Sequence, residues 1–101
     1  MNLVFKALSD PTRRRILQLL RERPMTAGQI ADHFDFAKPT LSAHFAVLRE
    51  ADLVESEKVG TSITYSLKLS VLEDALLSFA ETVGVGVRPA GRLKLATRRT
   101  R

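Results

Sequence analysis

Cysteine is absent from the sequence, which excludes disulfide scaffolds, thiol catalysis and zinc or iron–sulfur sites held by cysteine. Long apolar runs are absent too, and the short ones present cannot cross a bilayer. Residues 1–10 lack the basic-then-apolar layout of a secretory signal. The 101 residues are enough for one ordinary domain, and 45% hydrophobic with 27% charged residues is typical of a globular fold. We therefore expect a folded protein that stays in the cytoplasm.

Catalytic and nucleotide-binding motifs are also lacking. His33 and His44 are the two histidines, and neither lies in a recognisable arrangement with a nucleophile and an orienting acid. Neither G-x-x-x-x-G-K nor G-x-G-x-x-G opens a helix after a strand, so no glycine loop for phosphates is expected. We therefore expect no enzyme and no cofactor.

Acidic residues are missing from the C-terminal end, and this determines where the positive charge lies. The net charge is +5, but residues 1–83 carry 10 Lys/Arg against 11 Asp/Glu. We expect residues 1–83 to form the domain and residues 84–101 to be a flexible basic tail. The tail is a phosphate-binding arm, a solubilising end or a remnant of cloning. Its basic residues are Arg88, Arg92, Lys94, Arg98, Arg99 and Arg101.

Two helices are predicted before Pro24. A short one covers residues 1–8, and the next begins after Asp10, whose carboxylate caps it, with Pro11 in its first turn. Pro24 prevents this second helix from continuing. Its expected core residues are Ile16, Leu17, Leu19 and Leu20.

A helix-turn-helix is predicted next. Thr26 and Gln29 form a capping box for a third helix that ends near Asp35. A fourth helix covers residues 38–51 after a short break, with an apolar stripe at i, i+4 and i+7. The stripe consists of Leu41, Phe45 and Leu48, and the residues expected to point away from it are Pro39, Thr40, Ser42, Ala43, Ala46 and Val47.

A hairpin and a last helix complete the prediction. Residues 53–58 and 62–67 read as two strands, with Gly60 in the turn between them. In the second strand, Ile63, Tyr65 and Leu67 are expected to face inward. Ser70, in a capping box with Glu73, is expected to begin a helix that continues to Val83.

The fourth helix has the properties of one that reads DNA. A helix enters the major groove only if the side chains on its leading face are short enough to admit base edges. Hydroxyls and methyl groups there can contact bases, and a lysine at the helix start favours phosphate. Taken singly, each residue is better explained as a solvated surface residue, but as a group on one face they favour DNA contact. The residues are Lys38, Pro39, Thr40, Ser42 and Ala43.

His44 and the hairpin turn leave two interpretations open. His44 lies at the border of the core stripe, where it either packs against a neighbouring helix or contacts DNA. The turn is either an ordinary exposed turn or the tip of a wing that reaches the DNA backbone or minor groove. The wing candidates are Lys58, Thr61 and Ser62.

Three consecutive arginines form the densest basic cluster of residues 1–83. Arg13 precedes the core residues by one turn, so we expect it to form a salt bridge with an acidic residue at the core edge. Arg14 and Arg15 are expected to be more exposed, on a solvated face or in contact with phosphate.

The segments FKALSDPTRRRILQLL and MTAGQIADHFDFAKPTLSAHFAVLREADLVESEKVGTSITYSL together resemble the ArsR/SmtB-type winged-helix repressors over nearly all of residues 2–83. Within that family the chain is most similar to Sdp-type autorepressors, small members without a metal site. The resemblance implies a mainly α winged helix-turn-helix with a β-hairpin wing. It also implies a homodimer that binds an inverted-repeat operator near its own promoter and blocks transcription. The first and last helices then form the dimer interface, which maps onto Leu3, Val4, Leu72, Leu76 and Phe79.

Two features depart from the family pattern. The chain has no cysteine, and its last helix offers Glu73, Asp74 and Glu81 without a histidine, so no family-type zinc or arsenic site is expected. The fourth helix follows Ala37 where a Ser or Thr cap is common, so a cap bond of about 1 kcal/mol is either missing or supplied by Asp35.

Release from the operator is then expected to depend on a small ligand, a sequestering protein or the repressor's own concentration. A different function also fits the nearly neutral domain, namely a winged helix that binds another protein through the same face. Salt dependence distinguishes the two, because binding through phosphates weakens steeply with added salt.

Overall fold

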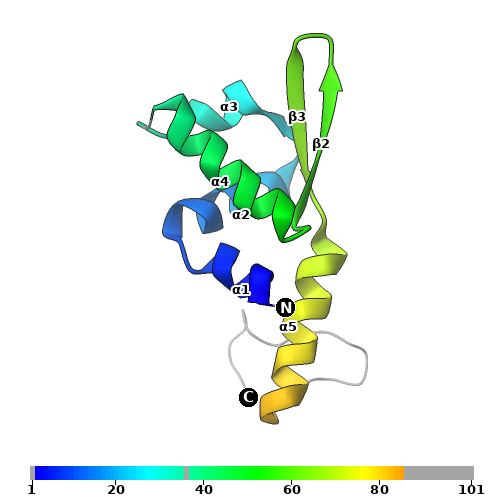
Figure 1. Ribbon diagram of the computed structural model, residues 1–101. Coiled ribbons are helices and arrows are strands. Elements are labelled where there is room, and N and C mark those ends of the chain that lie inside the picture. Colours follow the sequence, from blue (N-terminus) through cyan, green and yellow to red (C-terminus); the bar gives the residue numbers. More distant parts are fainter. Residues whose placement is uncertain (1, 36, 86–101) are drawn as a thin grey trace.

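The computed structural model describes residues 2–35 and 37–85 (Figure 1). It confirms a mainly α winged helix-turn-helix. The helices α1 to α4 gather together, the β2–β3 hairpin extends from them as a wing, and α5 extends in the opposite direction (Figure 1). The elements are α1 (Asn2–Leu8), α2 (Pro11–Glu22), β1 (Met25–Thr26), α3 (Ala27–Ala31), α4 (Lys38–Glu50), β2 (Val54–Val59), β3 (Ser62–Leu67) and α5 (Leu69–Val83).

The hydrophobic core lies where α1, α2, α3, α4 and the sheet meet. Its largest fully buried side chains are Ile16, Ile30, Leu48 and Leu53. The ring of Phe45 stacks on that of Tyr65 with centroids 4.5 Å apart, which joins α4 to β3. The apolar stripes predicted for α2 and α4 are confirmed, since every residue named for them is buried.

The sheet has three strands instead of the predicted two. Residues 25–26, which we did not predict as a strand, pair antiparallel with β3 through Met25–Tyr65 and Thr26–Thr64, so the strand order is β1-β3-β2. The turn between β2 and β3 is also tighter than predicted, because Val59 still pairs with Ser62. Gly60 has φ of 62°, a conformation that favours glycine.

Ile63 and Val47 lie differently from the prediction. Ile63 was expected to face inward, but its side chain is 38% exposed, since the wing projects beyond the core. Val47 was expected to point away from the core, yet it is half-buried and packs against it. Periodicity within a single element does not reveal how far a neighbouring element extends over it.

Two predicted helix starts are confirmed. The Asp10 carboxylate accepts a hydrogen bond from the backbone N–H of Arg13 at 3.1 Å. Thr26 accepts from the Gln29 N–H at 3.1 Å, and the Gln29 side chain accepts from the Thr26 N–H at 2.9 Å, which completes the capping box. The helix itself ends at Ala31, earlier than predicted. At α4 no side chain makes a cap bond, Asp35 included.

The predicted Ser70 cap is wrong, because α5 begins at Leu69 and its N-cap position is Lys68. Tertiary contacts hold that residue. Its N–H donates to the Leu53 carbonyl at 2.8 Å, and its ammonium donates to Asp52 at 2.8 Å. This side-chain hydrogen bond raises the pKa of Lys68. Since the chain is fixed one residue before Leu69, the helix starts too early for Ser70 to cap it.

Nearly all of the predicted basic tail lies outside the described residues, which end at Val85. The boundary between domain and tail therefore stays a prediction. Within residues 2–35 and 37–85, none of the helices combines the length and the apolar character that spanning a membrane requires.

Candidate nucleic-acid interface

The predicted reading face of α4 lies on the surface. Lys38, Pro39, Thr40, Ser42 and Ala43 are all exposed, whereas the opposite side of the helix is held in the core. Because these side chains are short apart from the lysine at the helix start, the face is slim enough to enter a major groove. All five residues lie on the exposed part of α4, and their contact with DNA stays a prediction.

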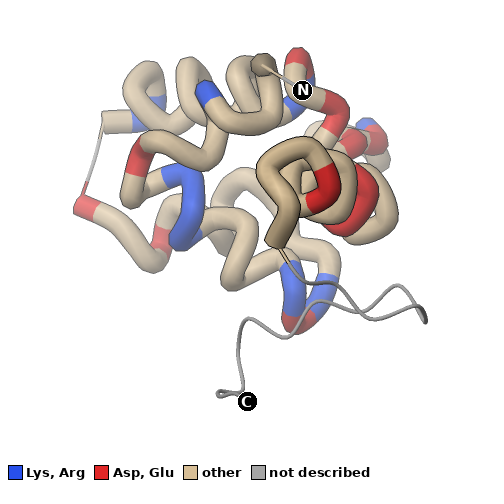
Figure 2. The backbone as a smooth tube through the Cα atoms, turned by 90° about the horizontal axis from the view of Figure 1, so that it is seen from below, with Lys and Arg blue, Asp and Glu red and all other residues tan. Residues whose placement is uncertain are grey.

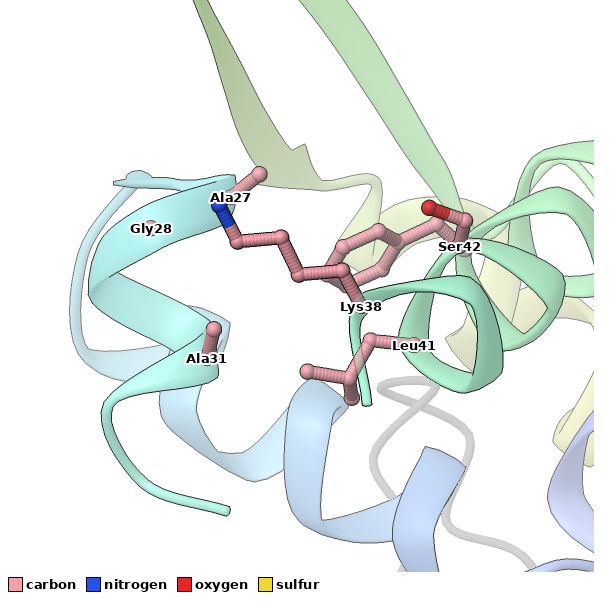
Figure 3. A pocket seen from close by; sticks show the side chains of 7 residues that line it. Ala27, Gly28, Ala31, Lys38, Leu41 and Ser42 are labelled. Atoms are coloured by element: carbon pink, nitrogen blue, oxygen red, sulfur yellow. The ribbon is translucent and has the colours of Figure 1, made fainter. Parts of the chain in front are cut away.

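Lys38 also borders a hollow of about 150 Å³ between α3 and α4. Figure 3 shows its side chain extending from α4 toward Ala27 at the start of α3, and Ser42 also lines the hollow. The rest of the lining is apolar or small, including Leu41 and Phe45. Lys38 is the only charged residue among those that line the hollow, and its ammonium remains accessible to an anion such as phosphate.

His44 turns away from the exposed face, toward α2. Its side chain is 16% exposed, and its Nδ1 lies 3.1 Å from a guanidinium nitrogen of Arg13 and 3.9 Å from a carboxylate oxygen of Asp10. This is the contact expected of a packing histidine. Contact of His44 with DNA stays a prediction.

Arg13 does not form the predicted salt bridge. Its guanidinium donates to the carbonyl oxygens of Lys6 at 3.0 Å and Ala7 at 2.9 Å, and a third N–H points at His44. These carbonyls lie in the last turn of α1, where helix geometry leaves them without partners within the helix. The Lys6 carbonyl also accepts from the N–H and the hydroxyl of Ser9. The forked guanidinium, with its five N–H donors, reaches both carbonyls and His44 at once.

The other two arginines of the cluster stay exposed, as predicted. Arg14 donates to the Leu8 carbonyl and Arg15 to the Gln18 side chain, each at 2.9 Å. Both contacts are within α1 and α2.

Asp10 carries the negative charge at the corner where it meets Arg13 and His44. Partial burial acts to raise its pKa, but it is outweighed by hydrogen bonds from the Arg13 and Thr12 N–H groups and by the positive charges of Arg13 and of the His44 ring when that ring is protonated. The net effect holds the pKa of Asp10 below its ordinary value. The carboxylate is therefore ionised at neutral pH.

The wing tip is exposed at Lys58, Thr61 and Ser62, the three predicted contact residues. Sequence reasoning missed an apolar component of the wing, since Val59 is 61% exposed beside them. The available signal was its place next to the turn glycine, where no core can cover it.

The predicted dimer residues differ in how much of their surface is exposed. Leu3 and Phe79 are 44% and 45% exposed, and Leu72 and Leu76 are half-buried. Val4 is 6% exposed and belongs to the core of the single chain, so it has little surface left for a partner. The exposed apolar surface continues beyond the predicted set with Val83 and Val85.

Aromatic packing joins the two helices of this surface. The rings of Phe5 and Phe79 meet edge to face with centroids 5.0 Å apart. The exposed apolar residues of α1, of α5 and just after it are Leu3, Phe79, Val83 and Val85, and we call them the α1–α5 surface.

Acidic groups mark the end of the molecule formed by α5. Figure 2 shows acidic positions on this helix, which are Glu73, Asp74 and Glu81, and α5 has no lysine or arginine. This end is electrostatically unsuited to phosphate. In the described ranges 2–35 and 37–85, no group of three or more His, Asp and Glu residues is arranged to hold a metal ion.

Comparison with known proteins agrees with this geometry. A family model described as a helix-turn-helix domain matches residues 8–57. The transcriptional repressor SdpR of Bacillus subtilis is 50% identical over 76 residues, which cover 75% of this chain and 84% of that protein. The crystal structure of an ArsR family transcriptional regulator is 30% identical and matches with a TM-score of 0.76, over 83% of this chain and 92% of that one. This chain belongs to the ArsR family.

Further relatives support the same family membership. The arsenical resistance operon repressor of Staphylococcus aureus is 36% identical over 75% of this chain and 73% of its own length. An ArsR-like regulator from a Rhodococcus species is 32% identical with a TM-score of 0.71, over 82% of this chain and 77% of that one. These relatives are transcriptional regulators, and this ArsR-family chain is a DNA-binding transcriptional repressor.

Proposed function

We propose that this repressor acts as a homodimer on an inverted-repeat operator. The observation that carries the proposal is the exposed, slim face of α4, beside an exposed wing. Two copies related by a two-fold axis place two α4 helices in successive major grooves on one side of the duplex. The half-sites then repeat at roughly 34 Å, about one helical turn.

The residues divide by task in this proposal. Thr40, Ser42 and Ala43 contact base edges, where hydroxyls and methyl groups discriminate sequence. Lys38 and the wing contact phosphates, which supply affinity without sequence preference. Pro39 is the second residue of α4, and its missing N–H removes one unpaired donor from the first turn.

The α1–α5 surface is the proposed dimer interface. Exposed leucine, phenylalanine and valine side chains on neighbouring elements are typical of surfaces that another molecule covers. A second copy of the chain satisfies this, and it directs the acidic α5 helices away from the phosphates.

The proposal extends to regulation. The resemblance to Sdp-type autorepressors favours repression of the protein's own promoter, and SdpR shares half of the aligned residues. We propose that release requires no metal, since the chain lacks cysteine and α5 lacks histidine. A small ligand, a sequestering protein or dilution of the repressor remain as the routes to release.

Selection of bound sequences from random duplex DNA tests the proposal most directly. Symmetric half-sites about one helical turn apart are expected. An asymmetric site or no enrichment would contradict the proposed dimer geometry. If the protein instead binds another protein through this face, no sequence is enriched and complex formation changes little with salt.

A double substitution tests the reading face. Thr40→Glu with Ser42→Glu places two carboxylates against phosphates and bases, so operator affinity should fall at least about 100-fold while the dimer persists. Fluorescence anisotropy with the selected duplex and analytical ultracentrifugation measure the two quantities.

Gln18→Glu with Ser70→Glu is the matched control, because it adds the same charge at exposed positions of α2 and α5. This control should retain most of the operator affinity. Normal operator binding by the Thr40/Ser42 variant would show that α4 does not read the DNA.

A further inference from the structure

The Arg13 side chain connects two elements that are distant in sequence. Nε and Nη2 donate to the carbonyls of Ala7 and Lys6 in the last turn of α1, while Nη1 lies 3.1 Å from Nδ1 of His44 on α4. One half-buried guanidinium therefore bonds to the end of α1 and to the side of the helix with the exposed reading face. Among the described residues no backbone hydrogen bond links α1 to α4, so the connection depends on side chains.

This contact requires a neutral histidine. Arginine carries five N–H donors, has no acceptor and stays protonated in proteins, so Nδ1 of His44 must accept. The ring proton then lies on Nε2. A doubly protonated ring would have no acceptor and would place a second cation 3.1 Å from the guanidinium.

We propose that Arg13 and His44 are positioning residues that set the orientation of α4 relative to α1 and thereby tune operator binding. The proposal rests on the proposed function, since α1 belongs to the α1–α5 surface and α4 to the DNA interface. In a dimer, the angle between the two α4 helices determines whether both enter their grooves. A contact that ties α4 to the dimerising helix therefore acts on operator affinity without touching DNA.

The same geometry predicts how acid affects the contact. Arg13 from α2 and Asp10 from the start of α2 are the charged groups that the described residues place against the ring, and α1 contributes only carbonyl oxygens to Arg13. A protonated ring loses its bond from Arg13 and gains an ion pair with Asp10, whose carboxylate is 3.9 Å from the same nitrogen. Arg13 then no longer holds α4.

Two substitutions of His44 separate the contact from general packing. In His44→Asn the amide oxygen occupies nearly the place of Nδ1 and accepts at every pH, whereas His44→Leu fills space without an acceptor. Affinity for the selected operator should fall about 10-fold in His44→Leu and recover to within about threefold in His44→Asn. Affinity for a scrambled duplex of the same composition should stay within about twofold for both.

A matched pair of arginine substitutions provides the control. Arg14 also donates to an α1 carbonyl, that of Leu8, but within the described part of the chain it makes no hydrogen bond to α4. Arg13→Met should lower operator affinity about 10-fold, while Arg14→Met, with the same loss of charge, should lower it no more than about threefold. Arg13→Met combined with His44→Leu should lose no more than the larger single effect, as expected for partners in one contact.

The pH profile distinguishes positioning from direct contact of His44 with DNA. If the contact positions α4, acid that protonates the ring should lower wild-type operator affinity relative to His44→Asn, because the protonated ring no longer accepts from Arg13. A histidine that touched phosphate would give the opposite result, because its protonation would tighten binding. His33 is present in both proteins and cancels in the comparison.

Three results would overturn the proposal, namely unchanged operator affinity in His44→Leu, equal losses in Arg13→Met and Arg14→Met, or tighter wild-type binding in acid. Equal losses for operator and scrambled DNA in His44→Leu would also overturn it, since they indicate a general loss of folded protein. Failure of the wild-type protein to select any DNA is a different outcome, because it contradicts the proposed function itself.

Discussion

Asp10 shows how much one side chain contributes here. Its carboxylate caps α2, lies near His44 and is surrounded by N–H donors that lower its pKa. Arg13 and His44, which meet Asp10 at this corner, were the hardest residues to predict, because they bond to each other across 31 residues of sequence. Their local context predicted a salt bridge for one and left two interpretations for the other, because neither partner is near in sequence.

Removal of the Asp10 carboxylate should destabilise the fold in a pH-dependent way. Asp10→Ala should lower the free energy of unfolding by about 1 kcal/mol at neutral pH through loss of the cap. Because the folded pKa lies below the unfolded one, the stabilisation is present above the unfolded value, near 4, and is lost as pH falls through the folded value. Urea denaturation at pH values of about 7 and 3.5 should therefore give a smaller difference in acid.

Asp10→Asn is the control for this effect. Asparagine caps helices about as well as aspartate but does not titrate in this range. It should retain most of the stability, with little pH dependence of its own. An Asp10→Ala difference that grew in acid would contradict the lowered pKa.

The wing and the last helix illustrate which elements local sequence specifies. Alternating residues and a turn glycine predicted the β2–β3 hairpin, and capping residues predicted α2 and α3. The N-cap of α5 lies two residues before the predicted Ser70, because Lys68 is held by Leu53 and Asp52. A cap motif decides a helix start only where no tertiary contact has already placed the chain.

The wing makes its own contribution to DNA affinity in our proposal. Lys58→Ala should weaken binding to all duplexes about equally and reduce the slope of log affinity against log salt by about one, as expected for one lost phosphate contact. Anisotropy titrations at several salt concentrations measure it. Lys6→Ala is a control, since this exposed lysine lies on α1 with the same charge and should leave the slope unchanged. Sequence-specific loss in Lys58→Ala would instead indicate base contact.

The whole molecule has a slim exposed helix face and wing, and a separate apolar and acidic region on α1 and α5. This division fits a repressor that binds DNA at one surface and its second copy at another. Leu3, Phe79, Val83 and Val85 were in part predictable from helical spacing, but the burial of Val4 was not. Spacing places a residue on the apolar side of a helix without telling which neighbour covers it.

A charge in the α1–α5 surface should separate the proposed dimer. Phe79→Glu buries an unpaired carboxylate if the dimer forms, so its dissociation constant should rise at least about 100-fold. Sedimentation velocity measures the dimer, and operator affinity should fall with it. Ser78→Glu, on the next and exposed residue of α5, should have little effect. An unchanged dimer in Phe79→Glu would place the interface elsewhere.

The sequence by itself determined the helices and the hairpin, the caps at Asp10 and Thr26, the buried stripes and the short-sided face of α4. Hydrogen bonds and periodicity between residues a few positions apart encode all of these. Tertiary structure alone decided the pairing of Met25 with Tyr65, the early start of α5 and the contact between Arg13 and His44, which are 31 residues apart. Such contacts exist only after the chain has folded, because only packing brings their partners within hydrogen-bonding distance.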